Sequence, residues 1–197
     1  VMTLSDVKEY AALRVEPLDE ACREWNEKAL LPVGYECNNL FLTDWDETDF
    51  GELDFYDLFD VFYPQIYHRK IPWQSGKNAG NSIAYGIPSK EFESVIQKFL
   101  NVKTDILREK TIYREKDDTY EYYPRGFYES EYPEHPYPEV TAFQENDDGT
   151  VTLTVHAVFP YLGSSRALVH EVTVRPMENA AAAVQYVSNK IVSSLDD

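Results

Sequence analysis

Basic residues are scarce in this sequence. The 197 residues include 18 lysines and arginines against 35 aspartates and glutamates, which gives a formal net charge of −17. A surface of this charge repels phosphate backbones and anionic membrane faces, so nucleic acid is not an expected partner. It suits cations or a basic protein, although plain solubility is the simplest explanation of such a charge.

Cysteines, long apolar runs and familiar catalytic motifs are also scarce or missing. The two cysteines, Cys22 and Cys37, are too few for a disulfide scaffold and leave either one bridge or two inert thiols. No Cys/His cluster has zinc spacing, and the sequence contains no P-loop, dinucleotide fingerprint, GxSxG or HExxH motif. No stretch approaches the roughly 18 apolar residues of a membrane helix. We therefore expect no catalytic set, no cofactor, no metal site and no transmembrane helix.

Residues 1–110 have mainly helical patterns. A short helix is expected after Ser5, and a second one from Pro17, whose apolar stripe places Cys22 toward the core. The clearest helix begins at Ser89, where apolar residues follow at helical spacing: Phe92, Val95, Ile96, Phe99 and Leu100. A shorter helical turn is expected from Thr104. The segment from Gln65 to Tyr85, which contains Trp73, is rich in Gly and Asn and is expected to be a loop.

An acidic run lies between the helix expected from Pro17 and the helix expected from Ser89. Eight carboxylates lie in residues 43–60 without a Lys or Arg, and apolar residues recur among them near helical spacing. We predict an amphipathic helix with an acidic outer face that ends before Pro64. A calcium loop of the EF-hand type needs Gly at its sixth position and Glu at its twelfth, where this chain has Asp49 and Phe55. A solvated helix face is therefore the main interpretation.

Residues 111–138 are rich in tyrosine and proline, and we expect an extended segment there with one or two short strands. Tyrosine faces stack on sugars and on cationic or proline-rich peptides, but they also cover sheets and helices. Residues 139–192 then contain four runs with the period-2 alternation of strands: 140–145, 150–159, 167–175 and 184–192. Asn146–Gly149 has the composition of a hairpin turn.

Helices followed by an antiparallel sheet predict a single α+β domain over residues 1–197. Its expected sheet is a four-stranded meander that packs on the helix starting near Ser89. At the level of fold analogy alone, the order of elements is similar to that of cystatin-like or NTF2-like cones.

Several segments resemble, in this order, a family of lipoproteins of Gram-positive gut bacteria that carries only an unknown-function label. They are Ile87–Glu93, Tyr120–Gly126, Asp148–Val155, His170–Pro176 and Gln185–Asn189. The resemblance covers residues 87–192. It implies an extracytoplasmic protein that is lipid-anchored to the cell membrane, with the anchoring cysteine upstream of Val1, and it implies no activity. Where the family pattern has a Gly-containing turn, this chain has Ala180–Ala183.

Two functions from different classes remain open at this point, besides a purely structural role within a longer lipoprotein. The first is a binding module that recognises a protein or a cell-wall glycan through the acidic run or the tyrosines, and its candidate residues are Asp54, Asp57, Asp60, Trp73, Tyr128 and Tyr132. The second is an NTF2-like enzyme with a site in the sheet cavity around His170. A histidine on an apolar strand face is more often a core residue than a general base.

Overall fold

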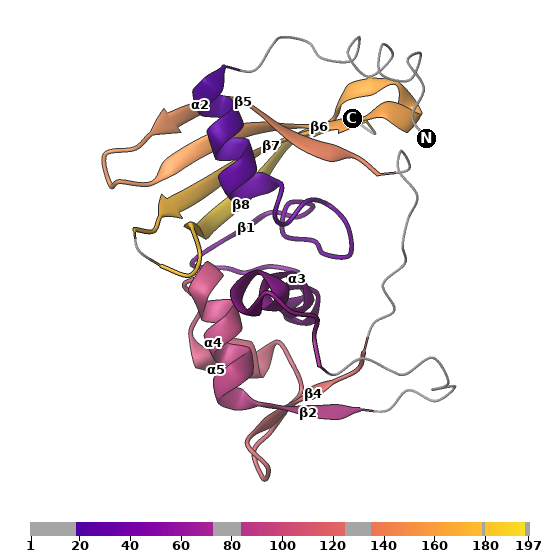
Figure 1. Cartoon of the computed structure of the whole chain (residues 1–197), viewed down its shortest axis with the longest axis vertical. Helices are drawn as coiled ribbons and strands as arrows, with labels where there is room; N and C mark the ends of the chain where they lie inside the picture. Colours follow the sequence, from indigo (N-terminus) through magenta and orange to yellow (C-terminus); the bar gives the residue numbers. More distant parts are fainter. Residues whose placement is uncertain (1–18, 73–83, 125–134, 179, 196–197) are drawn as a thin grey trace.

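The computed structural model describes residues 19–72, 84–124, 135–178 and 180–195 of the chain. It is a mixed α and β structure with a five-stranded antiparallel sheet, a smaller three-stranded sheet and several helices (Figure 1). In the described part, no helix combines the length and the apolar character that crossing a membrane requires.

The large sheet has the strand order β1-β8-β7-β6-β5. Four of its strands follow one another along the chain: β5 (Tyr137–Glu145), β6 (Val151–Phe159), β7 (Ser164–Pro176) and β8 (Val184–Ser194). The four strand-like runs of the sequence lie in these strands. The fifth strand, β1 (Trp45–Asp46), pairs with the outer edge of β8. The expected count of four was therefore wrong, because a strand of two residues has no periodicity that sequence can show.

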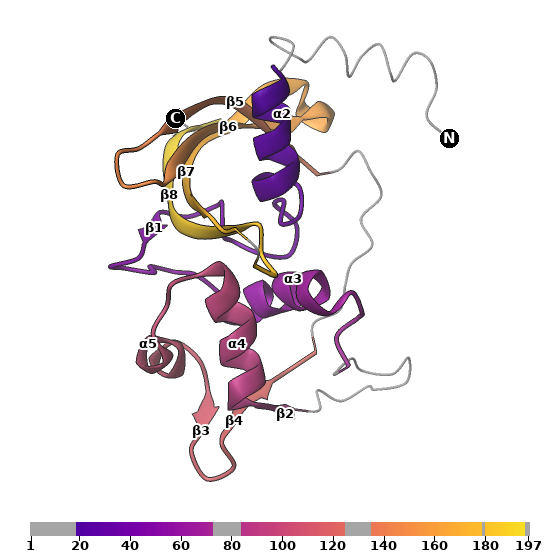
Figure 2. The same ribbon diagram turned by 60° about the vertical axis from the view of Figure 1, so that its left-hand side comes forward.

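One face of the large sheet is buried, and a helix lies across it. Along β6 the buried side chains alternate with half-buried threonines, as the period-2 pattern predicts. The buried face is covered by α2 (Glu20–Trp25), which continues as a π-helix, η1 (Asn26–Leu30). Figure 2 shows the curved sheet with α2 on its inner side. At a β-bulge in β5, the Asn26 side chain accepts a hydrogen bond from the Val140 N–H at 3.1 Å.

A second group of described elements forms the lower part of Figure 1. It contains α3 (Phe55–Tyr67), α4 (Ser89–Phe99), α5 (Thr104–Glu109) and a sheet of order β2-β4-β3. These strands are short: β2 (Tyr85–Pro88), β3 (Tyr113–Arg114) and β4 (Thr119–Tyr122). The helix from Ser89, the turn from Thr104 and the short strands of the tyrosine-rich segment lie where they were predicted. The expected packing of the large sheet on the Ser89 helix was wrong, because α2 and η1 cover the sheet and α4 contacts it mainly at β8.

The two parts share one buried core, and Tyr186 of β8 lies at their junction. Its ring is stacked with Phe62 of α3, and the ring of Phe62 is stacked in turn with Phe99 of α4 at 4.1 Å between centroids. The Tyr186 hydroxyl donates to the Ala29 carbonyl at 2.7 Å, inside the core. Helices α3 and α4 are therefore connected to the large sheet through one ring cluster, and η1 is connected to it through the Tyr186 hydroxyl.

The predicted acidic helix over residues 43–60 was wrong in its extent. Residues 43–54 contain β1 and turns, and α3 begins only at Phe55. The helix also continues through Pro64 and ends at Tyr67, where His68 takes a left-handed conformation. Pro64 has no N–H to donate to the carbonyl four residues earlier. The helix nevertheless continues for three residues beyond it.

Candidate functional site

The chain from Asp44 to the start of α3, which includes the short strand β1, forms a surface loop that carries most of the acidic run. We call residues 44–54 the acidic loop. Its exposed carboxylates are Asp44, Asp46, Asp49 and Glu52. Three of them are fixed by hydrogen bonds from the backbone, so the loop has a defined shape although it has little regular secondary structure.

Asp46 and Asp49 each close a turn, and Asp44 attaches the loop to β8. Asp46 Oδ1 accepts from the Thr48 hydroxyl at 2.6 Å, from the Thr48 N–H at 2.7 Å and from the Asp49 N–H at 3.0 Å, and these bonds lower the pKa of Asp46. Asp49 accepts from the Gly51 N–H at 2.9 Å, and Asp44 accepts from the Ile191 N–H of β8 at 2.7 Å.

Gly51 is required at the sharpest point of the loop. Its φ is +50°, a conformation that side chains disfavour, and an added Cβ would lie 2.8 Å from the Asp44 carbonyl oxygen. The end of the loop is Asp54, whose carboxylate accepts from the N–H groups of Tyr56 and Asp57 and thereby caps α3. The loop therefore presents its carboxylates from a constrained backbone.

Two basic side chains attach the acidic loop to the body of the protein. Arg175 of β7 contacts Glu47 with both guanidinium nitrogens, at 2.9 and 3.2 Å. Lys110, at the end of α5, donates to the Gly51 carbonyl at 2.6 Å. The first contact neutralises Glu47, while the second is made to the backbone and leaves the carboxylates of the loop charged.

Asp60, one of the predicted contact residues, lies inside the protein instead. It is 6% exposed, and its Oδ1 accepts from the Tyr122 hydroxyl of β4 at 2.7 Å. Burial raises the pKa of Asp60 to about 7, with a further rise from the Asp54 charge, while the Tyr122 hydrogen bond opposes the change. Of the other two predicted acids, Asp54 caps α3 and Asp57 is half-buried in its first turn. The predicted aromatic contacts Trp73, Tyr128 and Tyr132 lie outside the described residues.

His170 lies on the inner face of β7 with no exposed surface. Its Nε2 is 2.8 Å from the Tyr35 hydroxyl and its Nδ1 is 2.7 Å from Asn189 Oδ1. Because Asn189 uses its amide nitrogen to donate to the Thr43 carbonyl, its oxygen faces His170 and requires a proton on Nδ1. Burial lowers the pKa of His170 to about 4, so the ring is neutral and accepts from Tyr35.

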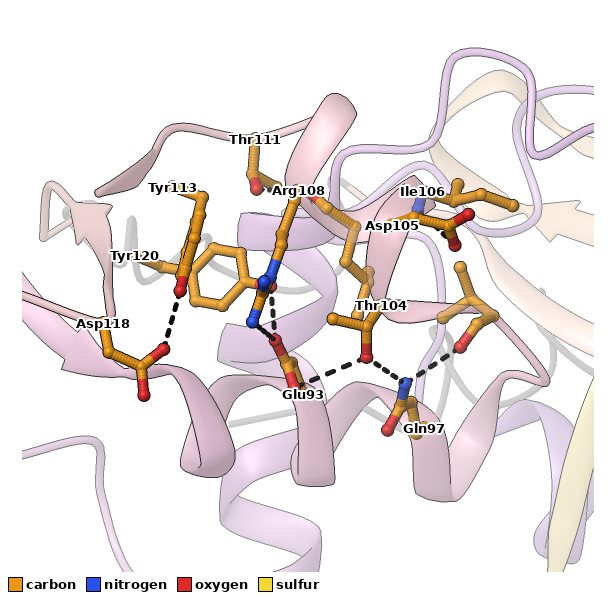
Figure 3. A network of polar contacts seen from close by, with 12 residues as sticks. Glu93, Gln97, Thr104, Asp105, Ile106, Arg108, Thr111, Tyr113, Asp118 and Tyr120 are labelled. Carbon is orange, nitrogen blue, oxygen red and sulfur yellow. Dashed lines mark hydrogen bonds and ion pairs between the residues drawn. The ribbon is translucent and has the colours of Figure 1, made fainter. Parts of the chain in front are cut away.

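A second polar network connects α4, α5 and β4 at the surface (Figure 3). Glu93 of α4 accepts from the Tyr120 hydroxyl at 2.9 Å and pairs with Arg108 of α5 at 3.3 Å. The Arg108 guanidinium also lies over the Tyr113 ring, 4.0 Å from its centroid. Tyr120 and Tyr122 are buried against helix side chains, so these two members of the tyrosine-rich segment are core residues.

The structure thus separates the predicted site residues into different roles. Sequence reasoning missed the fixed turns of the acidic loop and its contact with Arg175. A signal was available for the turns, because Asp46-x-Thr48-Asp49 and Asp54 before an apolar run are typical of aspartate turns and helix caps. Within the ranges that the structure describes, no group of three or more His, Cys, Asp or Glu side chains is arranged to hold a metal ion.

Fold and site together define a mixed α and β protein with a shaped acidic surface loop, one internal polar pair (Asp60 and Tyr122) and one internal polar triad (Tyr35, His170 and Asn189). The chain belongs to a family of unknown function, DUF6070, which it matches over residues 1–197. No curated protein and no solved structure matches it. The comparisons therefore identify the family, and a functional interpretation must rest on the geometry of the described residues.

Proposed function

We propose that the protein is an extracytoplasmic binding module that recognises a protein or a cell-wall glycan. The observation that carries this proposal is the acidic loop, whose exposed carboxylates are held in place by backbone hydrogen bonds. A preformed charged surface loses little conformational entropy when a partner binds, and its field speeds the encounter with an oppositely charged surface.

Between the two partner classes, the acidic loop favours a basic protein. Its exposed groups are carboxylates, which attract lysine and arginine side chains and have no stacking surface for a sugar ring. The glycan alternative depends on Trp73, Tyr128 and Tyr132, which lie outside the described residues. We expect these tyrosines to act on the dissociation rate, since aromatic contact area is lost only when the complex separates.

The proposed location is the outer side of the cell membrane, with a lipid anchor upstream of Val1. This part of the proposal depends on the resemblance of residues 87–192 to lipoproteins. Determining the N-terminus of the mature full-length protein tests it, because an anchored protein would begin at a lipid-modified cysteine.

An NTF2-like enzyme with its site around His170 has less support. A general base must reach the substrate proton directly or through one water. His170 has no exposed surface, and both ring nitrogens already have partners within 2.8 Å. The cone-like fold that this alternative needs is itself still a proposal from the order of elements.

The binding proposal is tested by capturing a partner from cell-wall extract and measuring its kinetics at two salt concentrations. The informative variant is Asp49→Asn with Glu52→Gln, because both residues are exposed and asparagine keeps the turn at Asp49. Asp54 and Asp60 are unsuitable, since one caps α3 and the other is buried. We expect the association rate at low salt to fall roughly three- to tenfold, with little change in dissociation.

The matched control is Glu115→Gln with Asp117→Asn, in the exposed turn between β3 and β4. It removes the same two charges from another part of the surface and should leave the association rate nearly unchanged. Equal rates for wild type and both variants, or equal losses in both, would show that the acidic loop is a solvated turn without a binding role.

A further inference from the structure

The acidic run is followed by a long segment without a carboxylate. Residues 61–90 contain no Asp or Glu, although the chain has 35 of them. The same segment carries His68 and four basic residues, Arg69, Lys70, Lys77 and Lys90. His68, Arg69 and Lys70 directly follow α3, and all three are exposed. Positive charge is therefore gathered at the end of α3, on a chain whose net charge is −17.

One of these cations shares a tyrosine ring with a cation of another helix. The Arg69 guanidinium carbon lies 5.5 Å from the centroid of the Tyr67 ring, and Lys98 Nζ of α4 lies 6.0 Å from the same centroid. The Tyr67 side chain is 37% exposed. We call Tyr67, Arg69 and Lys98 the basic cluster. Helices α3 and α4 lie side by side in both views of the fold, so residues far apart in the sequence meet here (Figures 1 and 2).

A second tyrosine holds Arg69 in place. The guanidinium donates to the Tyr63 hydroxyl at 2.9 Å and lies 5.8 Å from the Tyr63 ring centroid. Tyr63 is buried, and its ring packs on that of Tyr67 with 4.6 Å between centroids. Among the described residues this is the one hydrogen bond that Arg69 makes, and a guanidinium has several further N–H groups to donate. The cation is thus preorganised, which reduces the entropy lost when an anion binds.

A similar stack elsewhere in the protein is neutralised. Arg108 also lies over a tyrosine ring, that of Tyr113, but Glu93 pairs with it at 3.3 Å (Figure 3). Neither Arg69 nor Lys98 has a carboxylate of the described residues within ion-pair distance. On α4 the acid nearest to Lys98 in the sequence is Glu93, which is already paired with Arg108. The basic cluster therefore lacks the internal partner that completes the Arg108 network.

The ends of the two helices balance only part of this positive charge. Arg69 closely follows the end of α3, and Lys98 lies in the last turn of α4. The C-terminus of a helix carries roughly half a negative charge, so the two ends together balance about one cation. The basic cluster has two cations, and Lys70 is a third one next to it in the sequence. Positive charge is therefore left over for an external anion.

We propose that the basic cluster binds the phosphate group of a soluble ligand. A guanidinium donates in parallel to two oxygens of a phosphate, while an ammonium group pairs with another oxygen as a point charge. The Tyr67 hydroxyl is a further donor in the same cluster. A carboxylate has only two oxygens and a single charge, so it uses fewer of these donors.

The net charge of the protein favours a small ligand over a large anionic surface. A polyanion or an anionic membrane is repelled by the acidic body of the protein. A small ligand responds mainly to the charges within a Debye length, which is about 8 Å at physiological ionic strength. The inference goes beyond the proposed function and depends neither on a lipid anchor nor on the acidic loop.

The test is titration of the isotope-labelled full chain with inorganic phosphate, followed by NMR at constant ionic strength. The Arg69 side-chain N–H and the amides of residues 67–70 should shift and reach saturation. Arg69→Gln with Lys98→Gln should weaken binding at least about tenfold, because two charge-assisted contacts are lost. The matched control is Arg166→Gln with Lys190→Gln, which removes two exposed charges from the large sheet. This control should bind phosphate like the wild type.

A conservative variant separates a binding role from a structural one. Arg69→Lys keeps the charge but loses the parallel donors, so it should weaken phosphate binding roughly three- to tenfold. A purely structural role for Arg69 would leave the affinity for phosphate unchanged in this folded variant.

Several results would overturn the proposal. They include shifts that grow linearly without saturation, and equal affinity for phosphate in the wild type and the Gln variant of the basic cluster. Acetate that binds as tightly as phosphate would also overturn it, because the site would then fit a carboxylate. So would sedimentation with vesicles of phosphatidylcholine and phosphatidylglycerol that depends on Arg69, because the phosphate would then belong to a membrane. Since no protein partner is present, failure here leaves the acidic loop untouched.

Discussion

Replacing the buried Asp60 by asparagine should stabilise the protein at neutral pH and leave it nearly unchanged at pH 4. The asparagine side chain keeps an acceptor for the Tyr122 hydroxyl but carries no charge. The folded protein holds a proton on Asp60 up to a pKa of about 7, whereas an unfolded chain releases it near the ordinary value of 3.8. Between these values the folded state binds the extra proton, so its stability falls as the pH rises.

His170 has the opposite sign. Its pKa is about 4 in the folded protein against an ordinary 6.5, so within this interval the unfolded chain holds the extra proton and stability rises with pH. Each group changes the free energy of unfolding by about 1.4 kcal/mol per pH unit. As the pH rises from 3.8 to about 7, Asp60 lowers the free energy of unfolding by about 4 kcal/mol. As it rises from about 4 to 6.5, His170 raises the free energy of unfolding by about 3 kcal/mol. Where these two pH ranges overlap, the two slopes cancel.

Urea denaturation between pH 4 and 7.5, followed by fluorescence, measures this directly. The difference between Asp60→Asn and wild type removes the background of all other carboxylates, and it should grow by about 4 kcal/mol from pH 4 to above pH 7. His170→Gln should change in the other sense and become relatively more stable as the pH falls. A difference between Asp60→Asn and wild type that stays constant across this range would refute the reasoning.

Two further predictions concern the core. Tyr186→Phe should lower the free energy of unfolding by about 1–3 kcal/mol, because the buried Ala29 carbonyl loses its donor, and Tyr186→Ala should lower it by about 3–5 kcal/mol. In both variants urea should still unfold the protein in a single transition, because both parts share this ring cluster. Cys22 and Cys37 are free thiols, and Cys37 should react with iodoacetamide more than about tenfold faster, because burial raises the pKa of Cys22 to about 11; mass spectrometry of the unreduced protein should show no bridge, and rapid labelling of Cys22 would contradict its place in the core.

The parts of the fold that follow a regular period could be predicted from sequence. The alternation along β6 and the stripe of α4 each place one face in the core, so their elements and the burial of Cys22 were correct. The pairing of β1 with β8 and of β2 with β4 joins distant segments, which no local pattern encodes. The likeness to cystatin-like or NTF2-like cones was an analogy of element order, and no solved structure supports it.

The candidate site was harder to predict because aspartate serves two purposes. In the sequence, Asp46 and Asp54 cannot be told apart from aspartates that only carry a solvated charge. In the structure, the oxygen of Asp46 closes a turn and that of Asp54 caps a helix. Asp60 follows the same acidic pattern but points inward to Tyr122 across 62 residues of chain. Sequence could place carboxylates in this region, while their separate roles depend on contacts that only the folded chain provides.

The backbone hydrogen bonds of the acidic loop also limit how its sequence can drift among relatives. Asparagine accepts the same bonds as Asp46, Asp49 and Asp54, so these positions can become neutral while the turns survive, whereas lysine cannot replace them without loss of the turns. Glu52, whose side chain closes no turn, is free to take either charge. Selection for the turns alone would thus let aspartate and asparagine interchange freely in the family. Persistent aspartate at all three positions would require selection on the charge itself.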